Sequence, residues 1–117
     1  MSSGVDFNEA GTVTEEKWTN AFFASPLAFE PGSAFSYNSM NSYILARIVE
    51  RISGVGVADF LRSRLFAPLG ITNVLWEKSP EGCEKGGFGL SLSAESFLKL
   101  GYMMLSGGMF CGRRILS

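Results

Sequence analysis

The stretch GSAFSYNSMNSYILARIVERISG, residues 32–54, decides the fold of this chain. After a run of small residues, apolar side chains recur once every four positions, at Met40, Ile44, Ile48 and Ile52. That spacing places them on one face of an α-helix. We therefore expect a helix from Ser39 to Ser53, with Gly54 in the left-handed conformation that commonly ends helices.

The three residues Tyr37, Asn38 and Ser39 come directly before or at the start of this helix. In an extended segment, side chains two positions apart point the same way, so Tyr37 and Ser39 should face one cleft. The positive end of the helix dipole favours negative charge there. Two interpretations stay open: Tyr37 is a catalytic phenol, or it is an aromatic side chain that packs under a turn.

An earlier helix is expected from about Thr14 to Ala24. Thr12 and Glu15 have the spacing of a capping box, and Pro26 would stop the helix. Its buried face would hold Trp18, Ala21 and Phe22.

Three further segments follow the long helix. We expect a short helix from Val57 to Phe66, a short extended piece within residues 73–76, and a last helix from Ala94 to Leu105 with Ser93 as its N-cap. The apolar face of the last helix would consist of Phe97, Leu98, Gly101, Met104 and Leu105. Gly101 costs a helix about 1 kcal/mol relative to Ala, which suggests that another element approaches closely there. The chain would close with turns and a short hairpin.

These elements predict a mainly α fold: about four helices with long loops, in a single all-helical domain over residues 1–117. The chain is 46% hydrophobic, enough for a core, and its formal net charge is −1. The scattered basic residues argue against a nucleic-acid partner. No apolar run approaches the length of a membrane span, and the first residues do not look like a signal peptide.

The chain contains no histidine. A zinc site is therefore not expected, and no metal or cofactor is predicted. Any nucleophilic chemistry would have to use Lys or Tyr as the base. The two cysteines, Cys83 and Cys111, are interpreted as small thiols, with a disulfide between them as the alternative.

Three other patterns are weak. Ser96 and Lys99 have S-x-x-K spacing, but they fall inside the last predicted helix, where Lys99 is expected to be solvated. The glycines at 86, 87 and 89 do not form a phosphate-binding loop and are interpreted as a mobile connector. A group of loop carboxylates is expected to form a solvated surface rather than a paired acid/base site: Glu77, Glu81 and Glu84.

Taken together, the segments resemble a known family. They are SSGVDF, FEPGSAFSYNSMNSYILARIVERISG, FLRSRLFAPLGITNVLW and GGFGLSLSAESFLKLGYMMLSGGMFCGRRILS, in that order. This order resembles the middle of the serine β-lactamase family, which contains class C β-lactamases, low-molecular-weight penicillin-binding proteins, and related esterases and amide hydrolases. The resemblance covers nearly the whole chain.

The resemblance implies a two-part enzyme, with an α/β domain, an inserted helical domain and the active site between them. This chain looks like the helical part of that β-lactamase/transpeptidase-like fold, without the α/β domain. Tyr37 would be the tyrosine of the family's Y-x-N motif, which assists proton transfer, and Ser39 would hold the third position of the motif. Because that position is usually Asn, an esterase, peptidase or amide hydrolase fits at least as well as a β-lactamase.

The family's nucleophilic S-x-x-K and its K-T-G or H-x-G motif are not found in register among these residues. The chain alone is therefore expected to be inactive. The resemblance implies a small amide, ester or peptide-like substrate and an α/β domain as partner. It names no single compartment, although relatives are often exported. A separated helical part should also expose an apolar strip near Phe35 and Met40 and self-associate through it.

A helical binding module without an enzyme parent is the competing hypothesis, in which Tyr37 is an aromatic contact. A degenerate relative retained for ligand binding is a third.

Overall fold

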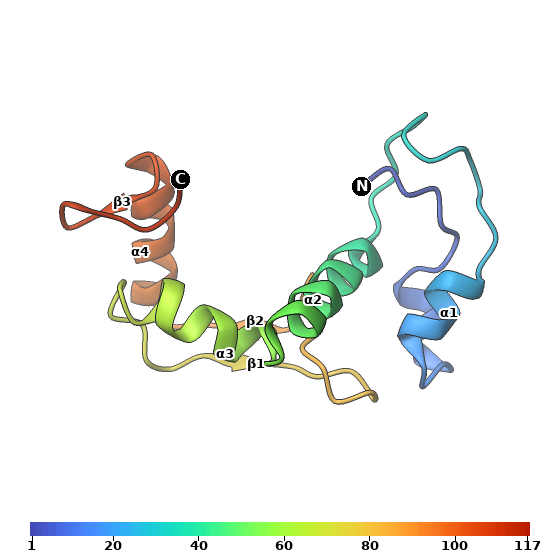
Figure 1. The fold of residues 1–117 in the computed structure, drawn as a ribbon, viewed down its shortest axis with the longest axis horizontal. Helices are drawn as coiled ribbons and strands as arrows, with labels where there is room; N and C mark the ends of the chain where they lie inside the picture. The colour runs from blue at the N-terminus through green and yellow to red at the C-terminus, as the bar shows by residue number, and fades with distance from the viewer.

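The computed structural model describes residues 1–117, and the chain forms an elongated arc (Figure 1). Its principal extents are 46 × 31 × 27 Å, and its radius of gyration is 15.9 Å. A compact domain of this length would have a radius of gyration of about 13 Å. The protein is therefore more extended than a self-contained domain of its size. None of its helices combines the length and apolar character needed to cross a bilayer.

Four α-helices and two small two-stranded sheets make up the regular structure, so the four expected helices are present but the chain is not all-helical. The helices are α1 (Trp18–Ala24), α2 (Ser39–Ser53), α3 (Val57–Leu61) and α4 (Ala94–Leu105). A 3₁₀ turn, η1 (Glu9–Val13), precedes α1, and a π-helical turn, η2 (Arg62–Phe66), continues α3. The strands pair as antiparallel hairpins, β1 (Leu75–Trp76) with β2 (Leu90–Ser91) and β3 (Met109–Phe110) with β4 (Arg113–Arg114).

Helix α2 has the bounds that its sequence predicts. It begins after Asn38, whose side-chain oxygen accepts a hydrogen bond from the Met40 backbone N–H. It ends at Gly54, which has φ 74° and donates its N–H to the Glu50 carbonyl. The predicted left-handed C-cap is confirmed. Helix α4 also matches its predicted bounds, and the Ser93 hydroxyl caps it by accepting from the Ser96 N–H.

The first helix is shorter than predicted, because it begins at Trp18 rather than Thr14. The predicted capping box does not form: the Thr12 hydroxyl donates to the Glu9 carbonyl inside the 3₁₀ turn. The Glu15 carboxylate accepts from the Lys17 N–H, and the Trp18 indole donates to the Glu15 carbonyl. These local hydrogen bonds hold a turn where helix was expected. The predicted inward face is correct, since Trp18 and Phe22 are buried.

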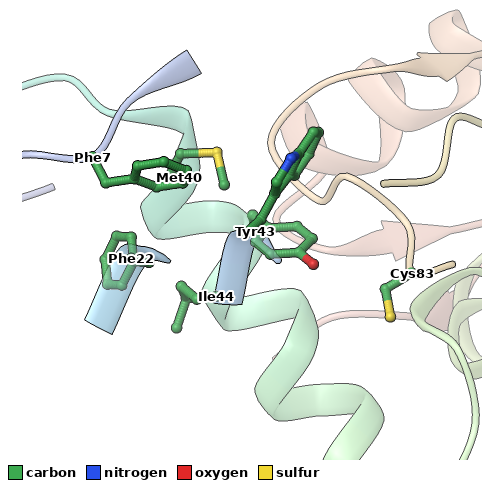
Figure 2. Packing of buried hydrophobic residues seen from close by; sticks show 7 residues of the cluster. Phe7, Phe22, Met40, Tyr43, Ile44 and Cys83 are labelled. Atoms are coloured by element: carbon green, nitrogen blue, oxygen red, sulfur yellow. The ribbon is translucent and has the colours of Figure 1, made fainter. Parts of the chain in front are cut away.

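Two separate clusters of buried side chains lie at the two ends of the arc. The first joins α1, α2 and the N-terminal segment through Phe7, Trp18, Phe22, Met40, Tyr43, Ile44 and Cys83. Figure 2 shows Phe7, Phe22, Met40 and Ile44 close together, with the Tyr43 hydroxyl directed toward the loop that carries Cys83. The second joins η2 and α4 through Phe66, Leu69, Ile71 and Met103. Only 20 of the 117 residues are buried, so each core is small.

The apolar face predicted for α4 is not buried by this chain. Met103 is the buried apolar residue of the helix, whereas four predicted core positions are exposed: Phe97, Leu98, Met104 and Leu105. A side-chain methyl at Gly101 would meet no atom within 4 Å, so no element of this chain makes the predicted close approach. On α2, Ile48 and Ile52 of the predicted apolar row are likewise exposed. The apolar side chains therefore lie at the predicted helical spacing, but this chain leaves most of them exposed.

Candidate functional site

The structure brings Tyr37 and Ser39 together at the N-terminus of α2. The Ser39 hydroxyl donates a hydrogen bond of 3.3 Å to the Tyr37 phenol oxygen. Tyr37 is 69% exposed, and Ser39 is 3% exposed. The i, i+2 geometry expected from the sequence is therefore present. The phenol is not packed under a turn, which removes the simplest purely structural interpretation of Tyr37.

Asn38 fixes the backbone between these two residues. It is buried, and its amide nitrogen donates to the carbonyl oxygens of Phe7, at 3.0 Å, and Val5, at 3.2 Å. Its amide oxygen caps α2 by accepting from Met40 at 2.9 Å. A single side chain thus ties the N-terminal segment to the first turn of the helix. Sequence reasoning did not identify this role, although Asn is a preferred N-cap residue.

The N-terminal segment is itself held by residues 26–36. Val5 and Leu27 form an antiparallel bridge, the Ala28 N–H donates to the Gly4 carbonyl at 2.8 Å, and the Asp6 N–H donates to the Pro26 carbonyl at 3.0 Å. Gly4 has φ 75°, and a Cβ there would lie 2.1 Å from the Phe29 carbonyl oxygen, so only glycine fits. This ladder supports the backbone that carries Tyr37.

Two hollows flank the Tyr37 side chain. The larger measures about 220 Å³ and is lined by Asn8, Glu9, Ala10, Tyr37, Asn38 and Ser39. The smaller, of about 80 Å³, lies among residues 3–8, residues 28–29 and the Tyr37 segment. The larger hollow is open and is lined by both residues of the Tyr37–Ser39 pair. A reactant in it would therefore lie beside the Tyr37 side chain.

Two glycines in the loop between β1 and β2 lie against the same turn of α2. A Cβ at Gly87 would lie 2.8 Å from the Ser39 carbonyl oxygen, and one at Gly86 would lie 2.7 Å from the Ser42 carbonyl oxygen. The interpretation of these residues as a mobile connector is therefore wrong. They are glycine because a larger residue would push the segment away from Ser39.

The loop carboxylates divide into two kinds. Glu77 is exposed and pairs with Lys85, as a solvated residue would. Glu84, by contrast, is buried and accepts from the Val57 N–H at 3.1 Å, at the start of α3. Glu81 is half-buried and accepts from the Thr19 N–H, the Thr19 hydroxyl and the Tyr43 hydroxyl. The prediction that all three are solvated is wrong for Glu81 and Glu84, because each satisfies donors at a helix N-terminus.

The pKa values of Glu81 and of its partner Tyr43 are both shifted. Burial acts to raise the pKa of Glu81, but the donors of Thr19 and Tyr43 and the nearby Arg47 charge outweigh it, and the pKa is lowered. Burial raises the pKa of the Tyr43 phenol. Tyr43 is therefore a structural phenol in the first core, in contrast to the exposed Tyr37.

Ser96 and Lys99 do not form a nucleophile pair. The Ser96 hydroxyl accepts from the Ser93 hydroxyl at 2.9 Å, and the Lys99 ammonium group pairs with Glu95 at 2.8 Å. Neither cysteine forms a disulfide. Cys83 is buried beside the Arg47 guanidinium group, and burial raises the pKa of its thiol to about 11, which makes it a poor nucleophile.

Comparison with known proteins places this chain in a family. The Beta-lactamase family matches residues 1–104. The chain is 36% identical over 66 residues to a lovastatin esterase of Penicillium rubens, a match that covers 56% of this chain and 15% of that protein. It is 34% identical over 86 residues to the 6-aminohexanoate-dimer hydrolase of Paenarthrobacter ureafaciens, covering 71% of this chain and 21% of that protein.

A third relative is the mitochondrial serine β-lactamase-like protein LACTB of Homo sapiens, 32% identical over 80 residues. That match covers 63% of this chain and 14% of the human protein. The chain thus spans about a fifth or less of the length of these relatives. With the family matching nearly all of its residues, the chain belongs to the serine β-lactamase family of hydrolases.

Proposed function

We propose that this chain is the helical part of a serine hydrolase and forms one wall of its active site. An α/β domain would form the other wall and carry the nucleophilic serine and its lysine. The observation that supports this most is the exposed Tyr37 phenol beside Ser39 at the start of α2, within a chain of this family. The reaction is acyl transfer from an amide or ester through an acyl-enzyme.

In this proposal, Tyr37 carries the proton. When the nucleophilic serine attacks the acyl carbon, its proton passes toward the tyrosine–lysine pair and then to the leaving amine or alcohol. Water then attacks the acyl-enzyme, its proton passes back to the nucleophilic serine by the same route, and the carboxylic acid product is released. Ser39 donates its own hydrogen bond to the phenol oxygen and so orients Tyr37 toward the larger hollow.

The substrate class follows from the relatives by analogy. Two of them are named as an esterase and a dimer hydrolase, and a D-aminopeptidase of Brucella anthropi is 46% identical over 43 residues. We therefore propose a small amide, ester or peptide-like substrate. Ser39 at the third position of the motif fits an esterase, peptidase or amide hydrolase at least as well as a β-lactamase.

The isolated chain is expected to be inactive, because its residues supply neither the nucleophile pair nor an oxyanion hole. Assays with nitrocefin and a p-nitrophenyl ester should show no turnover above the buffer blank. Turnover by the chain that disappears in Tyr37→Phe would contradict this inactivity.

The role of Tyr37 is tested in the longer polypeptide encoded around this sequence. The flanking gene should encode S-x-x-K upstream and K-T-G or H-x-G downstream. There, Tyr37→Phe should lower kcat by about 10²–10⁴-fold, the usual worth of a general acid–base group. Tyr102→Phe is the matched control, since Tyr102 is an exposed tyrosine on α4. A gene without these motifs would favour a binding module instead.

A further inference from the structure

A second groove, far from Tyr37 in the sequence, lies between η2 and the C-terminal hairpin. It has a volume of about 490 Å³, within the range of about 300–1,000 Å³ that is usual for small-molecule sites. Its apolar lining includes Leu61, Leu65 and Ile115, which pack on the second core. These three lining residues are partly buried, and their packing against the second core supports the floor of the groove.

All the charged residues that line this groove are basic. Arg64, Arg113 and Arg114 line it, which are three of the ten basic residues of the chain, and none of the eleven acidic residues lines it. None of the three arginines takes part in an ion pair. In a chain of net charge −1, this places an uncompensated positive field beside an apolar surface.

The arginines differ in how firmly they are held. Arg64 donates to the Phe60 carbonyl and lies 4.1 Å from the centre of the Phe60 ring. Arg114 donates to the carbonyl oxygens of Gly107 and Leu116, each at 3.2 Å. The Arg113 side chain has no hydrogen-bond partner in the chain. Two guanidinium groups are thus held in position, and the third has all its donors available.

The wall that carries Arg64 is a π-helical turn, Arg62–Phe66, in which the Ala67 N–H donates to the Arg62 carbonyl. Single π turns are rare and often mark functional sites. This turn places Arg64 and Leu65 on the same groove.

We propose that this groove binds a small amphiphilic carboxylate, with its apolar body along Leu61, Leu65 and Ile115 and its carboxylate among the arginines. Guanidinium groups match a carboxylate in planar, two-point geometry. This groove shares no lining residue with the two hollows beside Tyr37, and binding in it needs no covalent step.

The test is a titration of the ¹⁵N-labelled chain with decanoate below its micelle concentration, followed by two-dimensional NMR. We expect saturable shifts confined to residues 60–68 and 113–116. Acetate, which lacks the apolar body, and decyltrimethylammonium, which reverses the charge, should bind at least tenfold more weakly. Equal binding of the cationic amphiphile, or shifts spread over the whole surface, would overturn the proposal.

Variants distinguish specific binding by the groove arginines from a non-specific effect of net charge. Arg113→Glu should weaken decanoate binding by roughly tenfold or more, since it removes a charge-assisted hydrogen bond and puts a carboxylate that repels the ligand in its place. Arg113→Gln should cause a smaller loss. Arg51→Glu is the matched control, because Arg51 is an arginine without an ion pair that lines a different apolar groove, between α1 and α2. Equal losses in Arg51→Glu and Arg113→Glu would show that only net charge matters and would reject the site.

Discussion

Glu81 shows how one side chain joins three segments. Its Oε2 atom accepts from the Thr19 N–H at 2.9 Å, from the Thr19 hydroxyl at 3.1 Å and from the Tyr43 hydroxyl at 2.8 Å. The loop after β1 is thereby tied to the first turn of α1 and to the middle of α2. No local sequence pattern predicts this, because its partners are about 40 and 60 positions away.

The acid stability of the protein should depend on Glu81. Its folded pKa is lowered, so its contribution is present above the unfolded value of about 4.3 and is lost as the pH falls through the folded value. Glu81→Gln should therefore destabilise the chain at pH 7 by about 1–3 kcal/mol, the typical cost of disrupting hydrogen bonds to a charged group. At an acid pH below both the unfolded and the folded value, the difference from wild type should be much smaller.

Urea unfolding at the two pH values measures this difference. Glu30→Gln is the control, because the Glu30 side chain is exposed and forms no ion pair. An equal loss at both pH values would mean that the carboxylate charge is not what stabilises the fold.

At the scale of elements, two glycines should respond to the same change in opposite ways. Gly87→Ala would place a methyl 2.8 Å from the Ser39 carbonyl oxygen and should destabilise the chain by about 1–3 kcal/mol. Gly101→Ala meets no atom and lies inside α4, so it should stabilise the chain by about 1 kcal/mol. Thermal unfolding of the two variants, side by side, checks both signs. A destabilised Gly101→Ala monomer would show that α4 is closely packed after all.

The elements also show what the sequence could and could not predict. Ser93 and Gly54 are strong local end signals, and helices α4 and α2 begin and end at them as predicted. The Asn38 cap, which was not predicted, starts α2 at the expected residue. The pairing of Tyr37 with Ser39 follows from extended geometry alone. The predicted start of α1 was wrong because Glu15 and Trp18 form competing local hydrogen bonds.

The prediction of which face of α4 is buried was wrong for a different reason. Periodicity identifies which side chains are apolar, but it does not say which polypeptide covers them. Phe97 and Leu105 are apolar and exposed, while Met103 faces the second core. The positions of Gly86 and Gly87 against α2 are long-range contacts, which no local pattern reports.

At the scale of the whole molecule, the exposed apolar side chains should drive association. Phe35 is 76% exposed, as the sequence suggested, whereas Met40 is fully buried in the first core and does not belong to the exposed strip. The α4 face, with Leu105 87% exposed, is the stronger candidate for the contact.

Sedimentation velocity over a wide concentration range should therefore show reversible oligomers. Leu105→Gln should shift the equilibrium toward monomer, because it removes apolar area from the α4 face. Leu75→Gln, at an exposed leucine on β1, is the matched control and should have less effect. A strict monomer at every concentration would count against this surface.

The division of the interior into two clusters also bears on how the chain melts. Each cluster contains one fully buried methionine, Met40 in the first and Met103 in the second, so each half carries its own methyl reporter. With no shared core to couple the halves, the two methyl NMR signals should disappear at different temperatures instead of in one all-or-none transition. Coincident melting curves would show strong coupling. A molecule that binds only one half would raise the melting temperature of that half alone, and the two methionines would reveal which half it had bound.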